Sequence, residues 1–128
     1  MHASTVHGCN VAAQIAATAA LDECSEWLSA FVVHLQKMRD ICVDGLNDIK
    51  GISCVAPHGC YVAFADITGT GKSSSAIQQI LLNEAKVAVV PGLKQWFGNG
   101  AEGYIRLSFA TSSAILLEGI SRIKNSLN

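Results

Sequence analysis

The stretch Tyr104-Ile105-Arg106-Leu107-Ser108-Phe109 alternates between two kinds of side chain, which is the pattern of a β-strand with one covered face. Ile105, Leu107 and Phe109 share one face, so Arg106 lies on the other together with the tyrosine and the serine. Burying an arginine without an anionic partner is costly. The residues alone therefore allow an internal ion pair with one of the ten acidic residues, exposure on a solvent-facing sheet, or a site that binds a carboxylate.

Outward from this strand, the period of the apolar residues predicts the other elements. A period of two marks strands at 52–55, 60–65 and 87–90, and helical periods mark segments 10–21, 27–49, 73–83 and 112–127. The glycine-rich segment 91–103 is expected to be irregular. This order predicts an α/β fold: a two-layer sandwich whose small, largely antiparallel sheet is covered by helices, with a long N-terminal helix.

Two of the predicted helices differ in what they should bury. Residues 10–21 are alanine-rich and apolar on nearly every face, which predicts a short helix buried on all sides. In 27–49 the apolar residues recur at intervals of one, three or four, and charged residues take the opposite face, which predicts an amphipathic helix. Lys50 and Gly51 suit the C-terminal end of that helix.

The composition limits the class of protein. The chain has 128 residues, enough for one domain with a core. Half of the residues are hydrophobic and 15% are charged, against about 25% in an ordinary globular domain, which favours an apolar surface covered by a partner. The net charge of -1, with dispersed basic residues, predicts neither a nucleic-acid partner nor an anionic membrane partner.

The cysteines indicate a reducing compartment. They are scattered, odd in number and form no C-x-x-C pair, so we expect neither a metal site nor a disulfide framework. Reduced and mostly buried thiols in a cytoplasmic protein are the better interpretation. The N-terminus lacks the pattern of a signal peptide, and no apolar run reaches the ~18 residues of a membrane span. The five are Cys9, Cys24, Cys42, Cys54 and Cys60.

Gly69-Thr70-Gly71-Lys72-Ser73 imitates the end of a phosphate-binding P-loop, G-x-x-x-x-G-K-S/T. Asp66 stands where the first glycine of that motif belongs, and its carboxylate would repel a bound phosphate chain. We therefore expect a flexible connection in which Ser73 or Ser74 caps the next helix. An independent nucleotide-binding protein is the weakest of the alternatives.

Five segments follow one another along the chain in a recognisable order. Four of them are Gln14-Ile15-Ala16-Ala17 with Ala20-Leu21, Pro57-His58-Gly59-Cys60-Tyr61, Val87-Ala88-Val89-Val90-Pro91-Gly92 and Phe97-Gly98, and the fifth is the final strand, continued by Ala110. Taken together and in order, they resemble the C-terminal part of fold-type-I aminotransferases of the aspartate aminotransferase superfamily. The resemblance covers nearly the whole chain with near-normal spacing.

This resemblance implies a function for one residue. The family arginine that Arg106 matches binds the α-carboxylate of the amino-acid substrate, so an amino acid or a 2-oxo acid is the expected ligand. The family uses pyridoxal phosphate on a lysine in the context S-K-x-x-x-x-x-G-x-R, and no lysine of this chain lies in that context. For the chain alone we therefore expect no catalytic residue, no cofactor and no transamination.

The resemblance also implies an organisation and leaves two functions open. Residues 1–25 resemble the end of the large domain and its linker helix, and residues 26–128 resemble the small domain. One function is a truncated part of an aminotransferase that needs its large domain. The other is a non-catalytic, self-associating binding module that keeps the small-domain fold. In both, uncovered apolar surface predicts a homo-oligomer or a missing large domain as partner.

Overall fold

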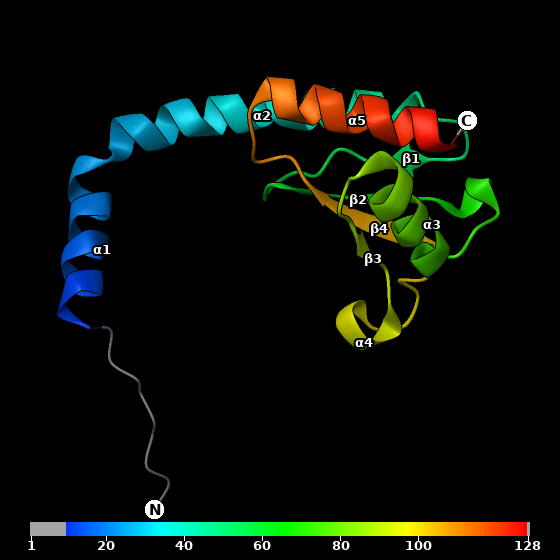
Figure 1. Ribbon diagram of the computed structural model, residues 1–128. Helices are drawn as coiled ribbons and strands as arrows, with labels where there is room; N and C mark the ends of the chain where they lie inside the picture. The colour runs from blue at the N-terminus through cyan, green and yellow to red at the C-terminus, as the bar shows by residue number, and fades with distance from the viewer. Residues whose placement is uncertain (1–9, 128) are drawn as a thin grey trace, which may run out of the picture. The chain divides into compact units, whose positions relative to one another are not determined.

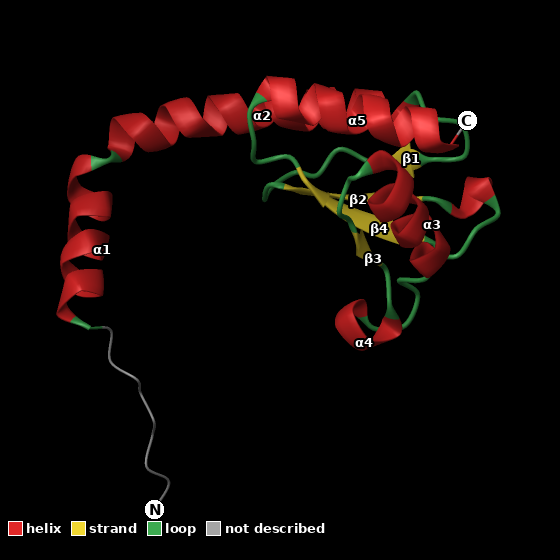
Figure 2. Ribbon diagram, in the orientation of Figure 1, coloured by secondary structure: helices red, strands yellow, loops and turns green. Residues whose placement is uncertain are grey.

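The computed structural model describes residues 10–127, which divide into two compact units, one ending at Val33 and the other starting at His34. The boundary falls within the second helix. Figures 1 and 2 show the elements along the chain. They are α1 (Val11–Glu23), α2 (Ser25–Asn47), β1 (Ser53–Cys54), β2 (Val62–Asp66), the 3₁₀ turn η1 (Thr68–Thr70), α3 (Ser74–Ile80), the π-helical turn η2 (Leu81–Ala85), β3 (Val90–Pro91), α4 (Lys94–Phe97), β4 (Tyr104–Ser108) and α5 (Ser113–Leu127).

One four-stranded antiparallel sheet organises the C-terminal unit. Its order is β1-β2-β4-β3, so the arginine-bearing strand β4 has a neighbour on each side. Arg106 is the cross-strand partner of Phe64 on β2 and of Val90 on β3. Ala63, Ala65 and Ile105 are fully buried on one face, whereas Phe64 is exposed on the other. The predicted alternation is therefore confirmed, and Arg106 lies on the open face.

The helices α2, α3 and α5 cover the buried face of this sheet, which confirms the predicted two-layer α/β sandwich (Figure 1). The last turns of α2, together with α3 and α5, place apolar side chains in one core. Gly45 lets α2 approach α5 closely, since a Cβ there would lie 2.7 Å from the Cγ2 atom of Ile120. Helix residues buried in this core include Met38, Cys42, Leu46, Ile77, Leu116, Ile120 and Ile123.

The expectation of an N-terminal helix buried on all sides is wrong. α1 forms, with the Oδ1 atom of Asn10 accepting a 2.8 Å hydrogen bond from the backbone N–H of Ala13. However, none of its residues is buried, and Leu21 is 83% exposed. The first turns of α2 are also exposed, with Trp27 at 63%. A helix without a polar face buries its surface only if other elements cover it, and the N-terminal unit provides no such cover.

All four predicted strands are shorter than expected, and a residue with positive φ stands before two of them, β2 and β3. Cys60 has φ 70°, which is incompatible with a strand, and β2 begins only at Val62. Lys86 has φ 57° and ends the π-helical turn, in which the N–H of Val87 donates to the carbonyl of Leu81. That bond removes Val87 from the sheet, and β3 contains only Val90–Pro91. Left-handed conformations are uncommon for residues other than glycine, so the apolar period could not reveal them.

The cysteines and the P-loop-like segment have different outcomes. Of the four cysteines within residues 10–127, Cys42 and Cys54 are buried, whereas Cys24 and Cys60 are exposed, so the expectation that most are buried is wrong there. All four are free thiols, and Cys9 lies outside the described residues. The predicted capping of α3 is confirmed, because the Oγ atom of Ser73 accepts a 3.2 Å hydrogen bond from a backbone N–H in its first turn.

Two other features are absent from residues 10–127. No helix in this range combines the length and the apolar character that crossing a bilayer requires. Histidine, cysteine and carboxylate side chains in the same range form no group that could hold a metal ion.

Candidate functional site

The guanidinium of Arg106 lies on the open face of the sheet beside aromatic rings. Its central carbon is 5.7 Å from the centre of the Phe97 ring, a cation–π distance. The Phe97 ring in turn packs at 5.3 Å, tilted, against Phe64, which is the cross-strand partner of the arginine. The arginine is half-buried, so its charge is partly withdrawn from water without being enclosed.

The rings around Arg106 form a continuous stack with Tyr104. Phe64 and Tyr104 are parallel to within 6°, with 5.1 Å between their centres. Tyr104 precedes Arg106 by two residues on β4, so both side chains leave the same face. Phe64 lies directly opposite Arg106 and diagonal to the tyrosine, where large side chains still reach one another across strands. We call Phe64, Phe97, Tyr104 and Arg106 the arginine cluster.

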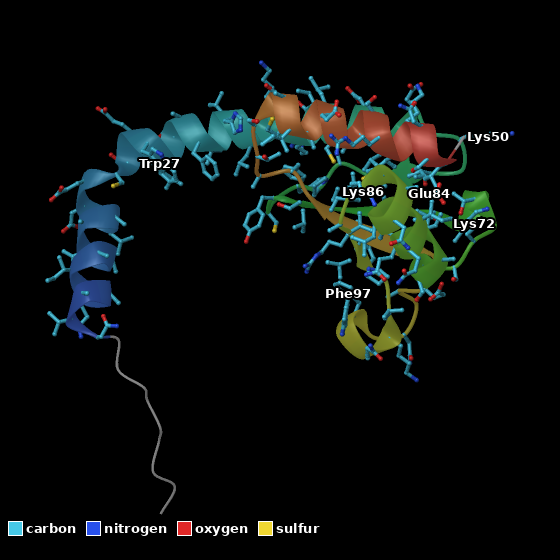
Figure 3. The ribbon with its side chains drawn as sticks, in the orientation of Figure 1. Trp27, Lys50, Lys72, Glu84, Lys86 and Phe97 are labelled. Atoms are coloured by element: carbon cyan, nitrogen blue, oxygen red, sulfur yellow. The ribbon has the colours of Figure 1, made fainter. Side chains whose placement is uncertain are left out.

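The short helix α4 carries Phe97 (Figure 3), which contacts Phe64 and Arg106 of the cluster. It ends at Phe97 and is capped by Gly98, which has φ 84° and whose N–H donates to the carbonyl of Lys94. The segment was expected to be irregular, and this turn of helix is a correction. The available signal was a glycine placed directly after four residues that can be helical, which is a common helix stop.

Gly92 fastens the loop that carries α4 to the start of β4. Its N–H donates a 2.8 Å hydrogen bond to the carbonyl of Tyr104. A Cβ atom at Gly92 would lie only 1.9 Å from the carbonyl oxygen of Ala101, so only glycine fits here without a shift of backbone. Both ends of the loop are thereby held together, and the arginine cluster has a rigid support.

A buried serine at the start of α3 anchors the residues that precede β4. Ser74, at the start of α3, is completely buried, and its Oγ accepts a 2.9 Å hydrogen bond from the N–H of Gly103. The N–H of Ser74 donates to the Oε1 atom of Glu102 at 2.8 Å. Ser74 was predicted only as a possible helix cap. Its role as an anchor for the residues before β4 depends on contacts 28 and 29 residues away, which sequence spacing could not indicate.

The guanidinium of Arg106 on the open face has no carboxylate partner within residues 10–127. All ten acidic residues fall within residues 10–127, yet none of the ion pairs in that range includes Arg106. This observation excludes the internal ion pair that the sequence allowed. A half-buried guanidinium on a rigid strand, flanked by rings, can donate two parallel hydrogen bonds to a carboxylate while the rings contact an apolar group.

The arginine cluster cannot by itself hold an aldehyde cofactor as a Schiff base. That bond needs a lysine amine, and the four residues of the cluster provide one guanidinium and three rings. Its chemistry fits the binding of a carboxylate and does not fit covalent attachment of a cofactor.

Comparisons with known proteins agree on one family. The family model described as aminotransferase class I and II matches residues 1–123. The chain is 35% identical to an aspartate aminotransferase of Pyrococcus horikoshii, over 99% of this chain and 32% of that protein. Among solved structures, an alanine aminotransferase of Pyrococcus furiosus matches with a TM-score of 0.83 at 31% identity, over 92% of this chain and 30% of that one.

A further solved structure with a similar fold has a different description. A protein of Corynebacterium diphtheriae, described as a putative PLP-dependent β-cystathionase, matches with a TM-score of 0.84 at 29% identity. The match covers 94% of this chain and 31% of that one. In each of these comparisons the chain spans about 30% of the relative's own length.

Proposed function

Because the chain belongs to the class I and II aminotransferase family, we propose that it is the substrate-carboxylate-binding part of such an enzyme. In this role Arg106 binds the α-carboxylate of an amino acid or a 2-oxo acid through two hydrogen bonds. The supporting observation is that this guanidinium, on a strand paired on both sides, has no carboxylate partner within residues 10–127.

The cofactor chemistry belongs to other residues. Pyridoxal phosphate, when bound in this family, withdraws electrons from the substrate's amino-bearing carbon. The arginine cluster lacks the lysine for that cofactor, and its contribution is to hold the substrate carboxylate in a fixed orientation. We propose that the chain works together with a cofactor-binding domain and does not transaminate alone.

Titration with 2-oxoglutarate, followed by the NMR signals of the backbone amides, tests the carboxylate site. We expect saturable shifts at β4 and α4. Arg106→Ala should weaken binding about 10- to 100-fold, because hydrogen bonds between charged groups contribute about 1.5–3 kcal/mol. Arg106→Lys should fall between the two, since it keeps the charge and loses the paired donors.

Arg122→Ala is the matched control for this titration. It removes the same charge from α5, where the Arg122 Nε atom pairs with Glu118 at 2.8 Å, and it leaves the arginine cluster intact. Equal affinities for the Arg106→Ala and Arg122→Ala variants would show that the carboxylate does not bind at Arg106, and the proposal would be abandoned.

A second function, a self-associating module, is favoured by the exposed apolar surface of the N-terminal unit. Leu21 and Trp27 are 83% and 63% exposed. We expect light scattering to show oligomers that Trp27→Glu shifts toward the monomer, because a charge opposes burial of that surface. Leu117→Glu, at a 54% exposed position on α5, is the control. A strictly monomeric wild-type chain would exclude this function.

A further inference from the structure

A polar hollow on the C-terminal unit lies apart from the arginine cluster. It measures about 290 Å³ and is lined by Gly69 and Thr70 of η1, by Lys72, by Lys50 after α2, and by Leu127 at the end of α5. In Figure 3, Lys50 and Lys72 lie at the same end of this unit, whereas Phe97 lies away from them. Two chain segments about twenty residues apart thus bring two lysines to the lining of one small space.

The two lysines have no carboxylate partner in the described chain. Within residues 10–127 the ion pairs are those of Arg39, Arg122 and Lys124, and no carboxylate lines the hollow. The nearest acidic residue in sequence, Asp48, pairs with Lys124. The hollow therefore carries two positive charges that nothing in the described chain neutralises.

Contact between two glycines creates this arrangement. A Cβ atom at Gly51 would lie 2.7 Å from the carbonyl carbon of Gly69, and one at Gly69 would lie 2.8 Å from the Cα atom of Gly51. Only because both lack side chains can the backbones touch, and this contact places the preceding Lys50 next to η1 and Lys72. The hollow is thus held by backbone, and only the lysine side chains have to adjust to a ligand.

The sequence argument against a phosphate at Gly69–Ser73 concerned the carboxylate of Asp66. In the structure its Oδ1 atom accepts hydrogen bonds from the backbone N–H of Thr68 at 2.8 Å and from its hydroxyl at 2.6 Å. These bonds hold the start of η1, and Asp66 does not line the hollow. Asp66 keeps its negative charge, but its carboxylate lies outside the lining of the hollow.

We propose that Lys50, Lys72 and the turn at Gly69–Thr70 form a binding site for a phosphate group, as inorganic phosphate or as a phosphate monoester. Two ammonium groups supply the charge for a dianion, since a lysine binds phosphate as a point charge. The site is independent of Arg106 and of the proposed role in carboxylate binding.

NMR titration of the whole chain with inorganic phosphate tests this site, with chloride at matched ionic strength as the reference. We expect saturable shifts of the amides at residues 50 and 69–72 with phosphate and no saturation with chloride. Lys50→Ala and Lys72→Ala should each raise the dissociation constant about fivefold, the effect of one exposed charge pair. Repeating the titration with a phosphate monoester then shows which form binds more tightly.

Lys37→Ala is the matched control, because it removes one lysine from α2 that does not line the hollow. Its dissociation constant should equal that of the wild-type chain. Shifts that do not saturate, or equal affinities for the Lys72→Ala and Lys37→Ala variants, would overturn the proposal. Exposed lysine substitutions should leave the amide spectrum dispersed, so a loss of binding would not reflect unfolding.

Discussion

Replacing Gly92 with alanine should destabilise the C-terminal unit through a backbone collision. The added methyl group would lie 1.9 Å from the carbonyl oxygen of Ala101 and 2.8 Å from that of Tyr104. Both atoms belong to backbone, so no side chain can rotate away. Contacts of Cβ atoms below 3.0 Å essentially never occur, and the two segments would have to separate by about 1 Å.

The expected loss of stability follows from the contacts that this separation of the two segments would disturb. The 2.8 Å hydrogen bond from the N–H of Gly92 to the carbonyl of Tyr104 would be lost, at about 1 kcal/mol. Overpacking around the buried Pro91 and Ala101 adds about 1–3 kcal/mol. We therefore expect the free energy of unfolding to fall by about 2–4 kcal/mol, within the 5–15 kcal/mol typical of a domain.

Urea unfolding at one fixed protein concentration measures this change, with Gly119→Ala as the control. Gly119 lies in α5 with open space where its Cβ would be, so the same substitution there should stabilise by about 1 kcal/mol through helix propensity. The two substitutions add the same atoms and should act with opposite signs. The reasoning is refuted if Gly92→Ala unfolds at or above the urea midpoint of the wild-type chain.

Three further perturbations have defined outcomes. Ser74→Ala should lower the free energy of unfolding by about 1–3 kcal/mol in urea titrations, because the backbone N–H of Gly103 loses its buried acceptor. An unchanged urea midpoint would contradict this expectation. Burial raises the pKa of the Cys42 thiol to about 12. Iodoacetamide near neutral pH should therefore modify the exposed Cys60 before Cys42, which should react only when the chain unfolds. Equal modification rates of the two cysteines by mass spectrometry would disprove this expectation. Hydrogen bonds from Thr68 lower the pKa of Asp66, so their stabilisation is present above the ordinary carboxyl pKa and lost as the pH falls through the lowered value. Thr68→Val should raise that pKa in an NMR titration, and no rise would refute the assignment.

Much of the C-terminal unit could be predicted because its elements have strong local patterns. The buried residues of α5 recur at helical spacing, and polar and apolar residues alternate along β4. Each pattern depends only on which residues share a face, which backbone geometry alone decides. The ordered motifs likewise indicated the family and, within it, Arg106.

The arginine cluster was predicted only in its central residue. Phe97 was assigned to an irregular loop, and nothing in its spacing indicated a contact with Phe64, 33 residues earlier along the printed sequence. That contact exists because Gly92 closes the loop against Tyr104, a backbone approach that no periodicity encodes.

The sequence by itself determined the order of the helices and strands other than α4, the face of β4 that carries Arg106, and the family. Only the tertiary structure decided that this arginine has no carboxylate partner within residues 10–127, and that α1 exposes residues expected to be buried. Local patterns record which side chains share a face, but neither burial nor charge pairing is local. Burial and charge pairing both depend on which distant segment packs against that face, and tertiary packing decides this.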